Sequence, residues 1–223
     1  MAHSPTRIAV AGAGYIGQAH MAAARSHAAL VLSAVVDPSP AAAAVAREAG
    51  VPLYASLQEL LATDRPDGIV LATPNQLHVA HAQTCLASGV PILLEKPVAP
   101  TLAEGRLLLA DEARSGVRVL VGHHRAHSPI MVQAREVVRS GRLGRIVSVL
   151  GSALFLKPDH YFADAPGRKE PGAGPILLNL IHEIHNLRML GGDIVAVQAM
   201  ASNAVRGFPV EDTVSIGLQF ASG

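Results

Sequence analysis

A carboxylate and an amine, Glu95 and Lys96, follow directly after a short apolar run at residues 90–94 and stand before Pro97. The run is short enough for a buried strand and too short to cross a membrane. We expect both charged side chains at the carboxyl end of that strand, where open parallel sheets bind their ligands. Pro97 restricts its own backbone and that of Lys96, which limits where the ammonium can point. Taken alone, the segment fits equally well a solvated Glu-Lys pair before a turn.

Three glycines follow the first apolar run of the chain with the spacing Gly-x-Gly-x-x-Gly. A strand is predicted before them at residues 7–11, and a helical pattern begins at Gln18. In this context Gly12 allows a tight turn, Gly14 lets a pyrophosphate approach the backbone, and Gly17 permits close packing of helix and strand. The motif predicts a dinucleotide site at the helix N-terminus, although an ordinary glycine-rich turn is an alternative. The predicted cofactor-binding residues of this turn are Gly12, Gly14, Tyr15, Ile16 and Gly17.

The next predicted strand, residues 30–36, ends in Asp37, about twenty residues after the last glycine of the motif. A carboxylate at this place can accept hydrogen bonds from the hydroxyls of the adenosine ribose. It would repel a 2′-phosphate, and residues 38–40 offer no arginine to hold one. Asp37 therefore predicts NAD as the cofactor rather than NADP.

Polar residues also follow the predicted strand at residues 68–72. Thr73 and Asn75 could bind ribose or orient a ring from the end of that strand, while helix capping is the alternative for both. His78 and His81 lie one helical turn apart, but no third ligand is near in the sequence, so we predict no metal there. The remaining predicted cofactor-binding residues are Thr73, Pro74, Asn75, His78, Glu95 and Lys96.

Six predicted strands alternate with helical patterns over residues 1–122, which is the sequence form of a doubly wound parallel sheet, the Rossmann fold. Ser56 and Thr101 are predicted to cap two of the helices, the second in a capping box with Glu104. The strands are predicted at residues 7–11, 30–36, 51–54, 68–72, 90–94 and 117–121.

Residues 123–223 predict a separate α+β domain with a different pattern. We expect helices at 129–140 and 176–190, joined by a long strand at 145–156 and a loop at 157–175. Two more strands are predicted at 194–205 and 212–220. The chain stops within this small sheet, so we expect an incomplete open sheet with an unprotected edge.

The composition excludes several classes of protein. The 223 residues are 50% hydrophobic with a formal net charge of +1, so there is no electrostatic footprint for nucleic acid or an acidic membrane. Cys85, the single cysteine, cannot form an intramolecular disulfide and is expected as a small buried side chain within a helix. The first residues show no secretion signal, and we expect a cytoplasmic protein.

The motifs in this order resemble the Gfo/Idh/MocA oxidoreductases, the group of glucose–fructose oxidoreductase and inositol dehydrogenase. The resemblance is carried by the glycine motif, Thr-Pro-Asn at 73–75, Glu-Lys-Pro at 95–97 and the segment 174–182. It implies an NAD-dependent oxidoreductase that transfers hydride between a secondary alcohol of a sugar, cyclitol or related polyol and nicotinamide. It also implies that Lys96 lies between nicotinamide and substrate and that His182 faces it as the acid–base group.

We expect His182 to remove the proton from the alcohol, since a neutral imidazole suits pH near 7. Lys96 would polarise the oxygen and stabilise an alkoxide, although the two roles could be reversed. Glu95 is expected to orient Lys96 or to contact the nicotinamide ribose. No metal is predicted, because the spacing of His182 and His185 is not that of a zinc motif. The predicted substrate-facing residues are His124, Arg125, Asn179 and His185.

The chain departs from the resemblance in two ways. The family often has an aspartate four residues before the histidine and an acidic residue three after it, where this sequence has Leu178 and His185. Asn179 can hydrogen-bond substrate but cannot act as a base. Family members usually continue further, so we expect a truncated copy or a piece of a longer protein, which would form a homo-oligomer if its sheet were complete. The alternative function is a non-catalytic NAD(H)-binding sensor or scaffold, although such a protein would need neither Lys96 nor His182.

Overall fold

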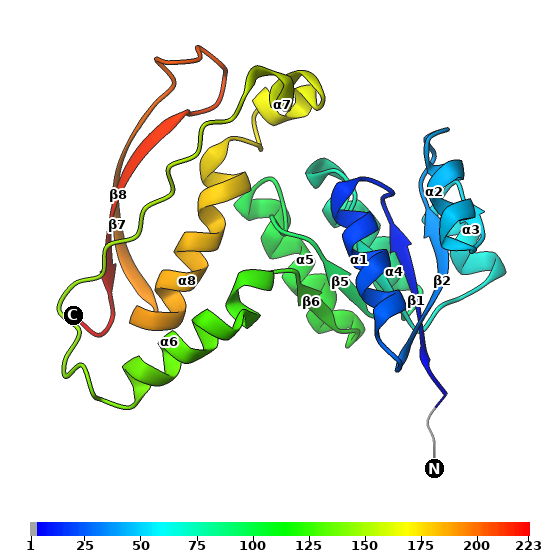
Figure 1. The fold of residues 1–223 in the computed structure, drawn as a ribbon, viewed down its shortest axis with the longest axis horizontal. Coiled ribbons are helices and arrows are strands. Elements are labelled where there is room, and N and C mark those ends of the chain that lie inside the picture. Colours follow the sequence, from blue (N-terminus) through cyan, green and yellow to red (C-terminus); the bar gives the residue numbers. More distant parts are fainter. Residues whose placement is uncertain (1–3) are drawn as a thin grey trace. The chain divides into compact units, whose positions relative to one another are not determined.

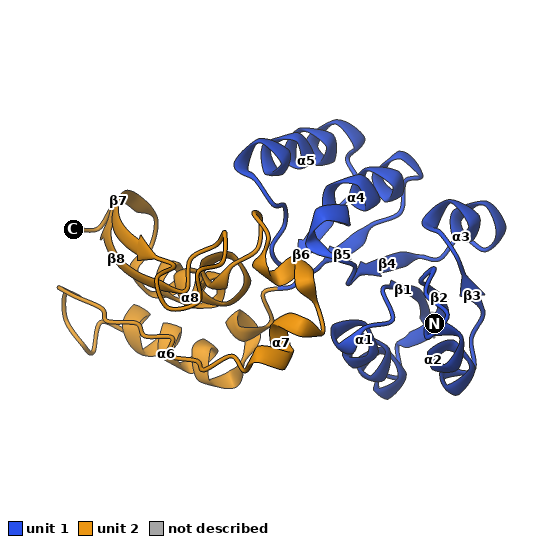
Figure 2. Cartoon of the chain, turned by 90° about the horizontal axis from the view of Figure 1, so that it is seen from above, with its two compact units in different colours: residues 1–122 blue, residues 123–223 orange. Residues whose placement is uncertain are grey.

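The computed structural model describes residues 4–223 and divides the chain into two compact units. The first unit is residues 1–122 and the second is residues 123–223 (Figure 2). Each unit has its own secondary structure and is described by itself below.

The first unit is built on a six-stranded sheet in which every pair of neighbours is parallel. The spatial order of the strands is β3-β2-β1-β4-β5-β6. From β1 the chain first adds strands on one side of the sheet and then returns to add β4 on the other side of β1, as in doubly wound dinucleotide-binding folds. The predicted Rossmann fold is confirmed. Its strands are β1 (Thr6–Ala11), β2 (Leu30–Val36), β3 (Leu53–Tyr54), β4 (Gly68–Leu71), β5 (Ile92–Leu94) and β6 (Val119–Val121) (Figure 1).

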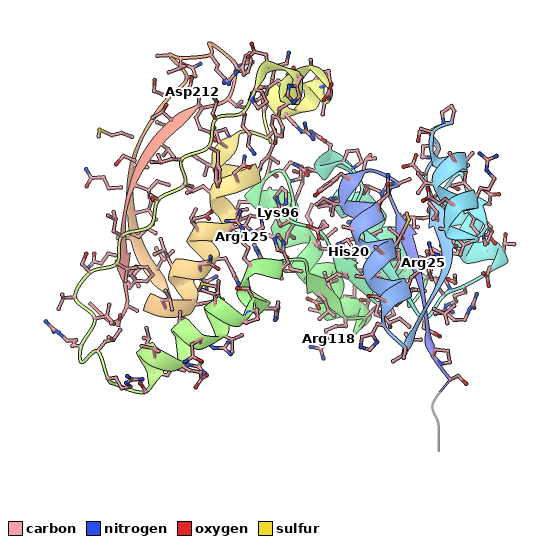
Figure 3. The ribbon with its side chains drawn as sticks, in the orientation of Figure 1. His20, Arg25, Lys96, Arg118, Arg125 and Asp212 are labelled. Carbon is pink, nitrogen blue, oxygen red and sulfur yellow. The ribbon has the colours of Figure 1, made fainter. Side chains whose placement is uncertain are left out.

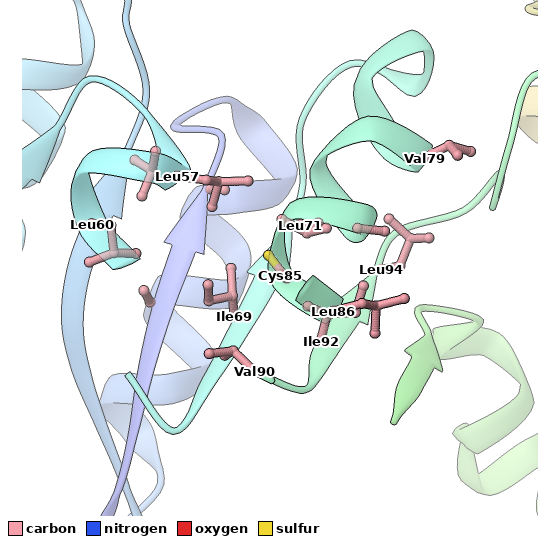
Figure 4. Packing of buried hydrophobic residues seen from close by; sticks show 14 of the residues in the cluster. Leu57, Leu60, Ile69, Leu71, Val79, Cys85, Leu86, Val90, Ile92 and Leu94 are labelled. Carbon is pink, nitrogen blue, oxygen red and sulfur yellow. The ribbon is translucent and has the colours of Figure 1, made fainter. Parts of the chain in front are cut away.

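Helices cover both faces of this sheet, with α1 and α2 on one side and α3, α4 and α5 on the other (Figure 2). Because side chains of a strand alternate between faces, Val10 packs with the first pair of helices while Ala9 and Ala11 pack with the second group. Figure 4 shows part of the core on the second side, where Leu57 and Leu60 of α3 and Cys85 and Leu86 of α4 pack with Ile69, Leu71, Ile92 and Leu94 of the sheet. Cys85 is fully buried in this core, and burial raises the pKa of its thiol to about 12, which confirms its expected packing role. The helices are α1 (Tyr15–Ser26), α2 (Ala42–Ala49), α3 (Leu57–Thr63), α4 (His78–Ala87) and α5 (Leu102–Ser115).

Two predicted caps begin helices of the second group. The Ser56 hydroxyl accepts a hydrogen bond from the Glu59 amide at 3.2 Å, at the start of α3. At the start of α5 the Thr101 hydroxyl accepts from the Glu104 amide at 3.2 Å and donates to the Glu104 carboxylate at 2.6 Å. These contacts satisfy backbone donors that the first turn leaves without partners, and both predicted caps are confirmed.

The second unit contains α6 (Pro129–Arg139), α7 (Asp159–Ala163) and α8 (Ile181–Gly191), with one antiparallel pair of strands, β7 (Ile194–Ser202) and β8 (Thr213–Phe220) (Figure 1). A π-helical turn, Ile176–Leu180, leads directly into α8. Ser128 caps α6 by accepting a hydrogen bond from the Met131 amide at 3.3 Å. The unit is α+β with a small sheet, as predicted.

The long strand predicted at residues 145–156 is wrong, and the described part of this unit has two strands instead of three. β-branched residues favour an extended backbone, but a strand also needs a neighbour with unpaired backbone groups, which sequence pattern does not supply. The segment leaves Leu150 and Leu154 exposed at 95% and 92%. The loop predicted at 157–175 was also too simple, because it contains α7 and a 3₁₀ turn at Pro166–Lys169. Within residues 4–223 no helix is long and apolar enough to cross a bilayer.

Candidate functional site

The glycine turn after β1 combines tight packing with one open position. A Cβ on Gly12, whose φ is +97°, would lie 2.4 Å from the Ala72 carbonyl oxygen, and one on Gly17 would lie 1.8 Å from the Gly12 carbonyl oxygen. No atom lies within 4 Å of a Cβ built on Gly14. Gly14 is also the N-cap of α1, and no side chain caps that helix. The turn therefore leaves free space and backbone N–H groups at a helix N-terminus, which fits a pyrophosphate.

Asp37 lies beside this turn, at the end of β2, and is held there by main-chain donors. One carboxylate oxygen accepts from the Ala13 amide and the other from the Ser39 amide, both at 2.8 Å. Burial raises the pKa of Asp37, but the hydrogen bonds from Ala13 and Ser39 outweigh it, so the pKa lies below its ordinary value. An ionised carboxylate next to the pyrophosphate position is suited to accept hydrogen bonds from a ribose and to repel a phosphate.

His78 connects the loops that follow β4 and β5. Its Nε2 lies 2.9 Å from the Thr73 carbonyl oxygen, and its Nδ1 lies 2.7 Å from the Pro97 carbonyl oxygen. The residue is 1% exposed. Because both ring nitrogens face main-chain oxygens, His78 holds the two loops together and presents neither nitrogen to open space. The Thr73 hydroxyl contacts Nδ1 of His81 at 3.1 Å, which fixes the same loop from its other side.

Glu95 has a partner that sequence reasoning missed, His20 on α1. The His20 Nε2 donates to Oε1 of Glu95 at 2.8 Å, and the Lys96 amide donates to Oε2 at 3.3 Å. Gly122 leaves room for the carboxylate, since a Cβ there would lie 2.7 Å from Oε1. Glu95 is 9% exposed; burial raises its pKa, but His20 and the Lys96 amide lower it further, to below the ordinary value. His20 follows Gly17 at i+3 and so shares the sheet-facing side of α1, which is the signal that could have found it.

The predicted residues of the first unit thus gather at the carboxyl ends of four strands. The glycine turn follows β1, Asp37 follows β2, Thr73 to Asn75 follow β4, and Glu95 and Lys96 follow β5. Figure 3 shows Lys96 and His20 on the ribbon. Tyr15 and Ile16, at the first turn of α1, are exposed at 87% and 43%. The strand ends supply the geometry that a dinucleotide needs: an open phosphate position, a ribose acceptor and polar groups on neighbouring strands.

In the second unit, the imidazole rings of three other histidines, His123, His124 and His185, cluster near His182 on α8. The rings of His124 and His182 meet edge to face with centroids 5.0 Å apart. His185 stacks on His123 at 4.2 Å with the rings 3° from parallel. His182 is 5% exposed. His123 was missed by sequence reasoning, and its position directly before His124 was the available signal.

Charge around this histidine cluster is partly neutralised within the unit. Arg125 forms an ion pair with Glu183, so its predicted contact with substrate competes with an internal partner. Burial, followed by the charges of Arg188 and His127, lowers the pKa of His185, which favours a neutral ring near pH 7. Across residues 4–223, no three His, Cys, Asp or Glu side chains are grouped so that they could hold a metal ion.

Both parts of the chain match models of one family. Residues 6–123 match the model described as "Oxidoreductase family, NAD-binding Rossmann fold" of GFO_IDH_MocA, and residues 131–223 match the "GFO/IDH/MocA C-terminal domain". The chain is 28% identical to the rhizopine catabolism protein MocA of Rhizobium meliloti, over 97% of this chain and 68% of that protein. It is 31% identical to an inositol 2-dehydrogenase of Leifsonia xyli subsp. xyli, over 85% of this chain and 55% of that protein.

The fold is similar to that of a solved dehydrogenase. The WlbA dehydrogenase of Bordetella pertussis, solved in complex with NADH and UDP-GlcNAcA, superposes with a TM-score of 0.94 at 26% identity. The match covers 98% of this chain and 68% of that chain. The chain therefore spans between 55% and 68% of the length of these three proteins.

Proposed function

Because the chain belongs to the Gfo/Idh/MocA oxidoreductase family, we propose that it is an NAD-dependent dehydrogenase acting on a secondary alcohol of a sugar, cyclitol or related polyol. The observation that carries the proposal is the open position at Gly14, beside an uncapped helix N-terminus and the ionised Asp37. A relative named inositol 2-dehydrogenase and a similar structure holding NADH and a nucleotide sugar support the substrate class.

The cofactor residues have separate proposed tasks. The amides at the start of α1 would bind the pyrophosphate, and Asp37 would accept hydrogen bonds from the adenosine ribose. Thr73 and Asn75 would contact the nicotinamide half, with His78 holding their loop in place through the Thr73 carbonyl. Bound NAD⁺ supplies the hydride acceptor.

Oxidation of an alcohol also requires removal of a proton from oxygen. We assign this step to His182, whose ring takes the hydroxyl proton, and we assign stabilisation of the resulting oxygen charge to the ammonium of Lys96. The reverse assignment, with Lys96 as the base, is the competing one. Glu95 would fix the backbone that carries Lys96, since its carboxylate accepts hydrogen bonds from the Lys96 amide and from the His20 ring.

Turnover with a panel of polyols tests the proposal directly. We expect NAD⁺ reduction, followed by the absorbance of reduced nicotinamide, with at least one member of a panel of inositols, neutral sugars, uronic acids and sugar phosphates. NAD⁺ affinity is measured in parallel by titration. Binding of NAD⁺ without turnover of any member would instead favour a sensor or scaffold, the reading that the missing carboxylate at Leu178 supports.

Cofactor preference should depend on the charge of Asp37. Asp37→Asn keeps an oxygen for the Ala13 amide but removes the negative charge that opposes a 2′-phosphate. We expect the ratio of kcat/KM for NADP⁺ to that for NAD⁺ to rise about tenfold or more, the scale of one close charge–charge contact in a partly solvated site. Asp67→Asn is the matched control, because it is the same change at a carboxylate that accepts from the Arg7 amide at 2.7 Å, at the other end of β1. An unchanged ratio in Asp37→Asn would remove the basis for choosing NAD.

A further inference from the structure

A cavity of about 210 Å³ lies inside the second unit, between the loop that contains α7 and the segment leading into β8. Asn179 lines it, three residues before His182 and so about one helical turn away. Three cations also line it, namely Lys157, Arg168 and Arg206. We propose that this cavity binds an anionic group of the substrate, a carboxylate or a phosphate, so that the substrate is an acidic sugar or polyol. The inference rests on the proposed dehydrogenase function for the identity of the bound molecule.

Two of the cations each lie against the same aromatic ring, that of Tyr161. The Arg168 guanidinium lies 4.0 Å from the centroid of the Tyr161 ring, and the Lys157 ammonium lies 4.8 Å from the same centroid. Within residues 4–223 neither cation is in an ion pair with a carboxylate. An anion in the cavity would give each of these two cations an oppositely charged partner.

The third cation is already compensated. Arg206 pairs with Asp159 at 3.1 Å, donates to the Lys157 carbonyl oxygen, and lies 4.7 Å from the centre of the Phe162 ring. It therefore fixes the backbone that carries Lys157. Lys157 and Arg168 are left as the two groups that an incoming anion can neutralise.

Two carboxylates on the cavity wall, Glu211 and Asp212, accept hydrogen bonds from main-chain amides. Glu211 accepts from the Ile176 amide at 2.8 Å. Asp212 accepts from the Arg206 amide at 2.9 Å and from the Val205 amide at 3.0 Å. Both hydrogen bonds lower the pKa of Asp212, and the one from the Arg206 amide has the larger effect. Both acids hold loops in place and neither lies within ion-pair distance of Lys157 or Arg168. Leu178 and Asn179 complete the wall without adding negative charge.

The ring faces complement this charge. Tyr161 and Phe162 pack edge to face with centroids 5.1 Å apart, and Phe208 meets Phe162 in the same way at 5.1 Å. Sugar rings present C–H groups that can pack on aromatic side chains, so aromatic rings beside cations suit a sugar with an anionic substituent, as in a uronic acid or a sugar phosphate. The cavity is therefore matched to the charged end of such a molecule, and Asn179 can hydrogen-bond its hydroxyls.

Calorimetric titration of the NAD⁺-loaded chain tests the inference with glucuronate, glucose 6-phosphate and glucose. We expect at least one anionic probe to bind about tenfold or more tightly than glucose, as one or two charge-assisted hydrogen bonds provide. Glucuronate and glucose 6-phosphate distinguish a carboxylate from a phosphate site. Lys157→Gln and Arg168→Gln should each weaken binding of the preferred anion by about fivefold or more and leave glucose binding unchanged. Lys169→Gln is the matched control, because that lysine lies over Phe208 and outside the cavity lining.

Arg168 also donates to the Tyr161 carbonyl oxygen at 2.5 Å, so its variant could disturb the loop. The Lys157 ammonium lies over the Phe155 and Tyr161 rings, so Lys157→Gln removes a charge without breaking a main-chain contact of the loop and keeps the test decisive if Arg168→Gln unfolds. Equal binding of glucose and both anions, no anion binding at millimolar concentration, or unchanged anion affinity in Lys157→Gln would each overturn the inference. Anion binding that depends on Lys157, in a protein that turns over no polyol, would keep the cavity assignment and reject the dehydrogenase instead.

Discussion

Replacing Lys96 by methionine is expected to lower turnover at least about a thousandfold while NAD⁺ affinity changes by less than about threefold. Methionine has nearly the length of lysine but carries neither charge nor hydrogen-bond donor, so it cannot stabilise a developing alkoxide. The proposed pyrophosphate and ribose contacts lie at the ends of β1 and β2 and do not involve this side chain. Steady-state kinetics with the best polyol of the panel and a cofactor titration measure the two effects separately.

Lys169→Met is the matched control for the same change of side chain, at a lysine that has no proposed role in catalysis. It should keep the wild-type rate. A Lys96→Met enzyme that turns over within about threefold of wild type would show that the reaction does not use this ammonium. A variant that instead loses NAD⁺ binding would assign Lys96 to the cofactor and leave the catalytic group to be found.

The second large effect is expected at the glycine turn, where two alanine substitutions should separate folding from binding. In Gly17→Ala the new Cβ would lie 1.8 Å from the Gly12 carbonyl oxygen, a backbone atom that cannot move aside without breaking the turn. We expect the free energy of unfolding to fall by more than about 3 kcal/mol, enough to unfold a marginally stable domain. Thermal and denaturant unfolding followed by circular dichroism measure the loss.

Gly14→Ala is the counterpart at the open position. Gly14 has a φ of −71°, which alanine adopts without strain, and nothing lies within 4 Å of the new methyl group. This variant should unfold at nearly the wild-type temperature, yet bind NAD⁺ at least about tenfold more weakly, because the methyl fills space reserved for the pyrophosphate. If Gly17→Ala is as stable as wild type, or if Gly14→Ala binds NAD⁺ normally, the turn does not have the geometry described.

Much of the first unit could be predicted because its signals are local. The apolar run of β2 ends at Asp37 and Pro38, which do not continue a buried strand, and its predicted and observed bounds coincide at Leu30 and Val36. Thr101 and Glu104 lie three residues apart and specify the start of α5 by themselves. The position of the site could also be predicted from the sequence. In a parallel sheet, ligands bind at the carboxyl ends of the strands, and polar residues that follow separate strands meet at that edge.

Predictions failed where a residue depends on a distant partner. His20 and Glu95 are 75 positions apart, and only the packing of α1 against the sheet brings them together. The same limit applies to residues 145–156, which have the composition of a strand but pair with no strand in the described residues. In the second unit, the stacking of His123 on His185 likewise arises from tertiary packing that no periodicity encodes.

The buried ring of His78 bears on how this protein can change by mutation. A neutral imidazole has one N–H and can donate to only one of the carbonyls of Thr73 and Pro97 at a time, and no shorter side chain spans both. Substitution of His78 would remove a contact from both the Thr73 loop and the Pro97 loop. We therefore expect substitutions at this position to be rare, both in evolution and in laboratory selection. New substrate preferences are therefore expected to arise from residues such as Asn179 and Lys157, on a nucleotide-binding half that stays constant.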